Sequence, residues 1–312
     1  MSNEHIPLLK LAKRSWLYPI YIPSYSRAGT APLLEMLKKA TFSVQSKVHI
    51  VVRPSEKVLY KKFYPWATVV TEKQTGIGPA RMRCLTDAEE RGYSRIVVLD
   101  DDIIHVSLLE QIHRENLGNH TRRFSSNVSG MVEPDVLIRS LMVGCKLADS
   151  VFHLNPKAAY GAARNALFSG DQDTAVGATL NKGSFPACVM FMDVGRFKMR
   201  YMPMVFRHHG EDLAMFLDTM TNGMQTFTLP TVAYDQHSKI TSTIPLDPQS
   251  VIGRPHMESS EDHYPHMHQF LRVSMRNKLG GVMRIGVNWR AWYAATSGKA
   301  IEVSLDTLIE EM

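Results

Sequence analysis

The sequence predicts an α/β fold, a mixed and mostly parallel sheet flanked by helices, with a basic extension at the C-terminal end. Runs of β-branched and aromatic residues alternate with helix-forming segments between residues 18 and 99, and this alternation is typical of βαβ units. The chain has 312 residues, of which 44% are hydrophobic. It is therefore long and apolar enough to bury a substantial core, and this composition disfavours disorder.

The first elements are expected in a regular order. Strands are predicted over residues 18–23, 48–53, 67–70 and 95–99. Helices are predicted over residues 32–39, 56–63 and 80–92. Pro79 suits the first turn of the third helix, and Gly92 suits the left-handed residue that ends it. The last strand leads straight into Asp100, at the kind of strand end where open α/β sheets bind their ligands.

The pattern is less regular between residues 109 and 183, where we expect loops and acceptor-facing structure around one helix over residues 135–147. A buried strand is predicted over residues 187–193. A helix over residues 211–221 follows, because apolar side chains recur there at helical spacing: Leu213, Phe216, Leu217 and Met220. Gly223 is expected to end this helix, before a short strand over residues 226–230.

The charge is concentrated in one part of the chain. The net charge is +6, and the stretch from His263 to Ala300 has no acidic residue while it holds Arg272, Arg276, Lys278, Arg284, Arg290 and Lys299. We divide the chain into a main domain over residues 1–245 and a basic C-terminal segment over residues 246–312, joined by a Pro-, Ser- and His-rich stretch typical of linkers. A basic surface favours polyanionic partners.

Several classes of site and location are disfavoured. Cys84, Cys145 and Cys188 are odd in number and widely spaced, which argues against a disulfide framework or a cysteine-built zinc site. The Gly76-x-Gly78 sequence lacks the residues of an ATP-binding or dinucleotide-binding loop. Residues 1–22 contain no apolar stretch of signal-peptide or membrane-spanning length, so we expect a cytoplasmic protein without a membrane partner.

The most informative feature is the run Asp100, Asp101 and Asp102 at the end of the predicted strand over residues 95–99. Adjacent carboxylates repel one another unless a cation is close, and hard oxygen ligands suit Mg²⁺ or Mn²⁺. Such ions are often held by one or two carboxylates together with the phosphates of a substrate. Acidic residues also cap helices or face water, but the position after a buried strand favours a metal and a nucleotide.

The order of these features resembles the metal-dependent, sugar-nucleotide glycosyltransferases of the GT-A fold, whose sheet is Rossmann-like. The resemblance covers roughly residues 18–238 and rests on four segments: Ile22-Pro23-Ser24-Tyr25, Leu99-Asp100-Asp101-Asp102, Gly210-Glu211-Asp212 and Tyr234-Asp235-Gln236-His237. More narrowly, the chain is similar to the TET-associated glycosyltransferases of bacteriophages, which are thought to add sugar to 5-hydroxymethylcytosine in DNA. That finer likeness rests on overall similarity and length.

The resemblance implies roles for individual residues. Those expected at the donor nucleotide are Pro23, Ser24, Tyr25, Arg27, Arg53, Gly78, Arg81, Asp100 and Asp101. Metal ligation is implied for Asp102 and His237. Asp212, with Glu211 as its alternate, is implied as the base that deprotonates the acceptor hydroxyl, although the macrodipole also favours carboxylates in a first helical turn.

The acceptor is expected to contact basic and aromatic side chains, which pair with phosphates and stack on bases: His209, Arg272, Arg276, Arg284, Trp289, Arg290 and Trp292. The resemblance thus implies transfer from a UDP-sugar to 5-hydroxymethylcytosine, with Mn²⁺ or Mg²⁺ and with inversion. Three alternatives stay open: a polysaccharide, lipid or protein acceptor, a nucleotidyltransferase, and a sugar-nucleotide-binding module without turnover.

Overall fold

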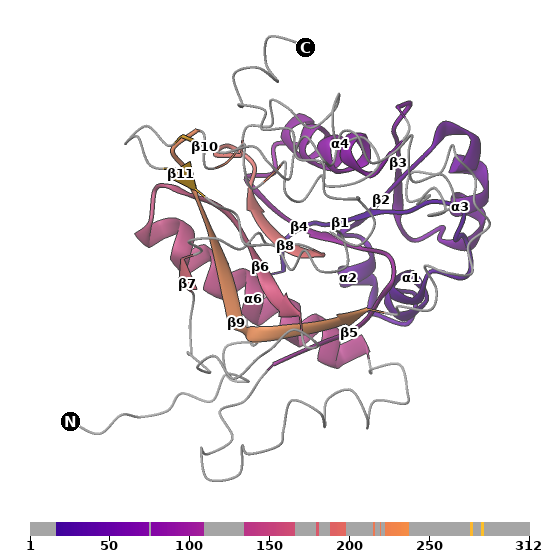
Figure 1. Cartoon of the computed structure of the whole chain (residues 1–312). Helices are drawn as coiled ribbons and strands as arrows, with labels where there is room; N and C mark the ends of the chain where they lie inside the picture. Colours follow the sequence, from indigo (N-terminus) through magenta and orange to yellow (C-terminus); the bar gives the residue numbers. More distant parts are fainter. Residues whose placement is uncertain are drawn as a thin grey trace, which may run out of the picture.

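The computed structural model describes residues 17–74, 76–108, 134–165, 179–180, 188–197, 215, 219, 222–236, 275–276 and 282–283. Within them, nine strands form one sheet in the order β3-β2-β1-β4-β8-β6-β9-β5, with β7 paired to β9 (Figure 1). The strands are β1 Ile20–Pro23, β2 Val48–Val52, β3 Thr68–Thr71, β4 Arg95–Leu99, β5 Ile103–Leu108, β6 Ala158–Asn165, β7 Thr179–Leu180, β8 Val189–Asp193 and β9 Gln225–Gln236. A separate pair joins β10 Met275–Arg276 to β11 Val282–Met283.

The sheet is mixed, as predicted, and its parallel part lies at the N-terminal side. Strands β3, β2, β1 and β4 are parallel neighbours. Strand β8 runs antiparallel to both β4 and β6, whereas β9 is parallel to β6 and antiparallel to β5. The carboxyl ends of β1, β2 and β4 therefore meet at one edge, where a parallel α/β sheet binds its ligands.

Helices cover both faces of the sheet. They are α1 Pro32–Leu37, α2 Phe42–Gln45, α3 Lys57–Phe63, α4 Ile77–Glu90 and α6 Pro134–Leu154, with a short 3₁₀ helix, η2, over Pro54–Glu56. Side chains alternate between the faces along each strand. Ile20 and Ile22 consequently pack with α1, α3 and α6, and Tyr21 packs with α4. Figure 1 shows α4 and α6 on opposite sides of the strands.

Two glycines end helices as predicted. Gly92 has φ +73° and Gly223 has φ +71°, a left-handed conformation that costs glycine little. The Tyr93 amide donates to the Ala88 carbonyl at 2.9 Å, and the Met224 amide donates to the Thr219 carbonyl at 3.0 Å. Both bonds have the spacing of a Schellman motif. Met215 and Thr219 are helical, while the rest of the helix expected over residues 211–221 lies outside the described part of the chain.

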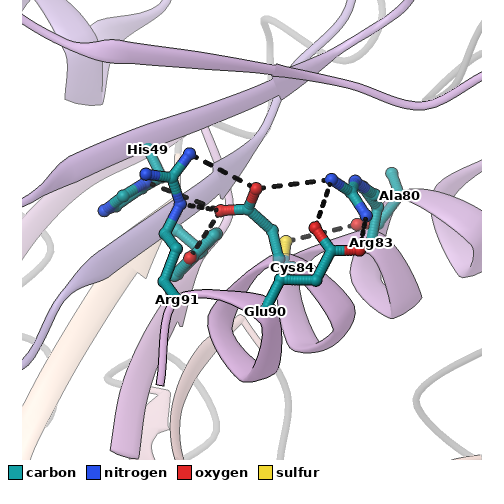
Figure 2. A network of polar contacts seen from close by, with 8 residues as sticks. His49, Ala80, Arg83, Cys84, Glu90 and Arg91 are labelled. Carbon is teal, nitrogen blue, oxygen red and sulfur yellow. Dashed lines mark hydrogen bonds and ion pairs between the residues drawn. The ribbon is translucent and has the colours of Figure 1, made fainter. Parts of the chain in front are cut away.

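A buried polar network joins α4 to the sheet (Figure 2). Asp87 on α4 accepts hydrogen bonds from the Tyr21 hydroxyl at 2.8 Å and from Arg91 Nε at 2.6 Å. His49 on β2 stacks on the Tyr21 ring, with 4.5 Å between ring centroids, and its Nδ1 is 3.8 Å from Asp87 Oδ2. Burial lowers the pKa of His49 to about 4, so this imidazole is neutral at pH 7 and the contact with Asp87 is no ion pair there.

The structure differs from the expected elements in the second half. Strand β5 begins directly after Asp102, β6 was not predicted, and α6 continues to Leu154. Strand β9 extends to Gln236, so Tyr234 to Gln236 lie on a strand and not after it. The β6 sequence is rich in alanine and glycine, which have low β-propensity, and packing of Gly161 against Phe227 overrides that preference. Among the described helices, none is both long enough and apolar enough to cross a membrane.

Candidate functional site

Candidate donor residues follow the carboxyl ends of three adjacent strands. Ser24 follows β1, Arg53 follows β2 and Asp100 follows β4. Strand β1 pairs with β2 on one side and with β4 on the other, so the sheet brings together residues that are far apart in the sequence. We call Asp100, Asp101 and Asp102 the acidic corner, and residues 24–30 the β1–α1 loop.

Asp101 is buried beneath the β1–α1 loop, with an exposed fraction of 1%. The Ser24 hydroxyl donates to Asp101 Oδ2 at 2.6 Å, and the Arg27 guanidinium forms an ion pair with Oδ1. Burial raises the pKa of Asp101, and the charge of Arg27 opposes that rise. These contacts make Asp101 an anchor for the loop, because both of its oxygens are occupied by protein donors.

Asp100 is more exposed and faces α4. Arg81 Nη2 donates to Asp100 Oδ1 at 2.9 Å, and the exposed fractions of these side chains are 3% and 21%. The Asp100 amide donates to the Cys188 carbonyl at 2.9 Å. Gly78 is buried two residues into α4, in the turn that carries Arg81. The structure therefore brings Arg81 and Asp100 together, and a ligand at this strand end would meet both charges.

Asp102 has the most perturbed environment of the three carboxyls. Burial, followed by the charges of Asp100 and Asp101, raises the pKa of Asp102 to about 7. A bound dication would remove this penalty, since a nearby positive charge favours the ionised carboxylate. The donor set therefore fits a hard cation. In the part of the chain that the structure describes, no three His, Cys, Asp or Glu side chains gather as ligands.

Tyr25 and Arg53 contact each other where strands β1 and β2 end. The Arg53 guanidinium carbon lies 4.7 Å from the centroid of the Tyr25 ring, within cation–π range. Arg53 has an exposed fraction of 8%, and its Nε and Nη2 atoms are buried without a hydrogen-bond partner among the residues that the structure describes. Buried donors without partners are costly. Together with Pro23, the last residue of β1, they form a surface with unused hydrogen-bonding capacity.

Sequence analysis missed two residues at this site. Tyr60 on α3 places its hydroxyl 2.7 Å from Ser24 Oγ. Cys188 has φ +65°, an uncommon conformation for a residue with a Cβ, and its carbonyl holds the Asp100 amide. The backbone strain at Cys188 has no signature in the sequence. Tyr60 lies on the predicted helix over residues 56–63, and only its spacing from neighbouring polar residues could have drawn attention to it.

The remaining candidate residues lie outside the described part of the chain: His209, Glu211, Asp212, His237, Arg272, Arg284, Trp289, Arg290 and Trp292. Arg276 is described only as a residue of β10. Two described neighbours bear on this group. Met215, three residues after Asp212, is buried in the α4-side core with Ala80 and Tyr160, and Gln236, just before His237, pairs with Ile103 beside the acidic corner.

Several solved structures are similar to this chain. Mannose-1-phosphate geranyltransferase from Thermus thermophilus is 10% identical, with 74% of this chain and 81% of that chain covered and a TM-score of 0.39. GalNAc-T7 with UDP, GalNAc and Mn²⁺ is 8% identical, with 70% and 43% covered and a TM-score of 0.41. Mannosyltransferase PcManGT from Pyrobaculum calidifontis, in complex with GDP-Man and Mn²⁺, is 14% identical, with 73% and 62% covered and a TM-score of 0.36. These scores are too low to assign an activity.

No curated protein sequence matches the chain. A family model does match the chain. The matched region begins two residues before β1 and ends beyond β9, so it includes the acidic corner together with helices α1 and α4. The matched model is that of the TET-Associated Glycosyltransferases, over residues 18–243. Because this match spans most of the chain and the whole sheet from β1 to β9, the protein belongs to the TET-associated glycosyltransferase family.

Proposed function

We propose that this glycosyltransferase moves a sugar from a UDP-sugar to the hydroxymethyl group of 5-hydroxymethylcytosine in DNA, with Mn²⁺ or Mg²⁺ at the acidic corner. Family membership makes the chain a glycosyltransferase. The observation that carries the rest is the acidic corner itself. One carboxyl is paired with Arg81, one is locked under the β1–α1 loop, and Asp102 has a pKa raised to about 7.

The donor nucleotide would lie across the carboxyl ends of β1, β2 and β4. Tyr25 offers an aromatic face for the base, and Arg53 offers buried N–H groups that have no hydrogen-bond partner within the described ranges of the chain. Asp100 accepts hydrogen bonds and suits the ribose hydroxyls, while Arg81 next to it suits the diphosphate. In this arrangement Ser24, Arg27 and Asp101 support the site from below and do not contact the base.

The cation would be held by Asp102 and His237, together with oxygens of the diphosphate. Support for His237 comes from the chain itself, because Gln236 pairs with Ile103 and these residues directly precede His237 and follow Asp102. Paired residues in antiparallel strands have Cα atoms about 5 Å apart, so a chain that continues past Gln236 in the same direction would bring residue 237 near Asp102. When bound, the cation would offset the negative charge that grows on the leaving diphosphate.

Asp212 would act as the base that takes the proton of the acceptor hydroxyl, with Glu211 as its alternate. Met215 on the same predicted helix packs into the α4-side core together with Ala80, the neighbour of Arg81. Met215 itself therefore lies on the side of the sheet where Arg81 lies, and it follows Asp212 by three residues. A base within hydrogen-bond reach of the acceptor contributes about 10²–10⁴-fold to the rate, and direct in-line attack would invert the anomeric carbon.

The DNA acceptor would be bound by the basic and aromatic side chains of residues 263–300. Arginines there can neutralise backbone phosphates, and Trp289 and Trp292 can stack on an exposed base. A modified cytosine inside a duplex is inaccessible to a buried site, so the enzyme would extrude it and offset a few kcal/mol of unstacking.

One assay tests the proposal. The protein is mixed with Mn²⁺, a panel of UDP-sugars and DNA that contains 5-hydroxymethylcytosine, and the digested nucleosides are weighed by mass spectrometry. A hexose or N-acetylhexosamine increment on 5-hydroxymethylcytosine, absent with unmodified cytosine and with EDTA, is the expected result. Transfer only to a polysaccharide, lipid or protein, or release of pyrophosphate from a sugar phosphate and a nucleoside triphosphate, would refute it.

A further inference from the structure

One helical face presents three side-chain oxygens to the β1–α1 loop at regular intervals. Glu56 ends η2, Tyr60 lies in α3 and Tyr64 follows its last residue. Residues four apart share one face of a helix. Glu56 Oε1 accepts the Ser26 amide at 2.6 Å, the Tyr60 hydroxyl accepts the Arg27 amide at 3.2 Å, and the Tyr64 hydroxyl accepts the Gly29 amide at 2.9 Å. We call these three residues the loop clamp.

The loop needs such contacts because its backbone is strained. Ser26 has φ +53°, a left-handed conformation that side chains disfavour and that persists only where the surroundings fix it. Gly29 has φ +80°, and a Cβ there would lie 2.6 Å from the Phe63 ring. The loop is thus pressed onto α3 at a point that only glycine allows, and amide hydrogen bonds hold both left-handed residues.

The clamp also reaches the acidic corner through hydroxyl groups. Ser24 donates its only hydroxyl hydrogen to Asp101 at 2.6 Å. The hydrogen between Ser24 Oγ and Tyr60, 2.7 Å apart, must therefore come from Tyr60. Burial raises the pKa of Tyr60 well above its usual value, so the phenol stays protonated and keeps this chain of donors intact. Tyr60 is fully buried, which protects the chain from competition by water.

We propose that Glu56, Tyr60 and Tyr64 are positioning residues for donor binding, which hold the β1–α1 loop in the conformation that places Tyr25 against the nucleotide. This inference rests on the proposed function in one respect, that the loop binds the donor. Because the clamp occupies the amides of Ser26, Arg27 and Gly29, the loop does not use these amides to cradle phosphate as glycine-rich loops do. The phosphates of the donor would then be bound by other groups, namely Arg81 and a cation at the acidic corner.

The double variant Tyr60→Phe/Tyr64→Phe removes two hydroxyls and keeps both rings. If the loop then samples other conformations, the apparent affinity for the donor falls in proportion to the fraction of molecules whose loop is in the binding-competent conformation. We expect the KM for the UDP-sugar to rise at least about tenfold, because the loop loses three hydrogen bonds, two at its amides and one at Ser24. The kcat at saturating donor and the KM for the acceptor should stay within about twofold, because chemistry and acceptor binding use other residues.

The matched control is Tyr18→Phe. The Tyr18 hydroxyl shares its one hydrogen between the Cys145 carbonyl at 2.9 Å and Asp149 Oδ1 at 3.1 Å, so this tyrosine also has two polar partners, away from the loop. It should lower the unfolding temperature without raising the donor KM. Glu56→Gln keeps an acceptor oxygen for the Ser26 amide and should retain donor affinity, whereas Glu56→Ala should lose it.

Hydrogen–deuterium exchange separates this inference from the proposed function. The amides of residues 26, 27 and 29 should exchange about tenfold faster in the double variant than in the wild type, with or without any donor. Calorimetric titration with UDP-sugar supplies donor affinity even if DNA proves to be the wrong acceptor. An unchanged donor affinity, or a loop that exchanges as slowly in the double variant, would overturn the positioning role, and a wild type that binds no sugar nucleotide would overturn both proposals.

Discussion

Neighbouring residues of the acidic corner have opposite environments. Asp101 has Arg27 and Ser24 as partners, whereas Asp102 is crowded by two other carboxylates. We therefore expect the two asparagine variants to fail in different ways. Asp101→Asn leaves Arg27 buried without its counter-charge, which typically costs roughly 3–5 kcal/mol of folding stability. Asp102→Asn removes a repulsive charge, so its stability should not fall, while metal-dependent turnover is lost.

Urea unfolding at pH 7.5 and transfer assays with Mn²⁺ measure these two effects on the same samples. The Asp102→Asn protein serves as the folded control for Asp101→Asn, because the substitutions are chemically identical and adjacent. Full activity in a folded Asp102→Asn variant would contradict the role given to Asp102. A stability loss at position 102 as large as that at 101 would contradict the contrast in their environments.

His49 makes stability depend on pH. The folded-state pKa of His49 is about 4, against 6.5 for the free side chain, so the unfolded chain binds more protons between these values. Stability is therefore complete above about pH 6.5 and falls as pH drops through that window, by on the order of 2 kcal/mol between pH 7.5 and 5. His49→Phe keeps the stacking on Tyr21 and should flatten this dependence. Urea unfolding at the two pH values measures it, and equal slopes in both proteins would rule His49 out.

At the scale of elements, the sequence predicts the bounds of a strand or helix where that element carries its own local pattern. Strand β4 is a run of β-formers, and it has the bounds that were expected. Gly92 predicted the end of α4 correctly, because the left-handed conformation that ends a helix depends on the local preference of glycine and not on distant contacts. Strand β6 was not predicted because alanine and glycine have low β-propensity, and its position depends on Phe227 of β9, which is far away in the sequence but adjacent in the sheet. For the same reason, sequence placed Arg81 and Asp100 near one nucleotide but could not reveal that Asp101 is buried beneath Ser24 and Arg27.

Gly161 tests the packing that overrides β-propensity. A Cβ at this position would lie 2.3 Å from the Phe227 ring on the adjacent strand, so Gly161→Ala must move either the ring or the strand. Overpacking of this kind costs about 1–3 kcal/mol. Gly92→Ala is the matched control, since a Cβ there meets nothing within 4 Å and the cost is only that of a left-handed alanine, about 1 kcal/mol. Urea unfolding compares the two variants, and an equal or smaller loss at Gly161 would show that β6 can relax.

At the scale of the whole molecule, charge separates the two substrates. The net charge is +6, and six basic residues fall within the acid-free stretch from His263 to Ala300. The proposed donor site is instead built from carboxylates that are balanced by arginines. A donor that is bound through a metal and a few charged side chains would depend on short-range electrostatic contacts. A DNA acceptor would meet a broad positive surface, and its binding would release condensed counterions from the duplex.

This difference predicts that acceptor affinity falls steeply with salt and donor affinity does not. The logarithm of DNA affinity should decrease with the logarithm of salt concentration by about 0.9 per phosphate neutralised. Arg284→Gln and Arg290→Gln should each reduce that slope by about one and weaken binding to all sequences alike. Fluorescence anisotropy with labelled duplex gives the slope between roughly 50 and 300 mM salt, a range over which the screening length shortens by about 60%. Calorimetry with UDP-sugar gives the donor comparison. A shallow slope would mean that the protein neutralises few phosphates. A slope that both variants leave unchanged would place the DNA contacts outside the basic segment, because screening acts on every phosphate contact regardless of the base that is read.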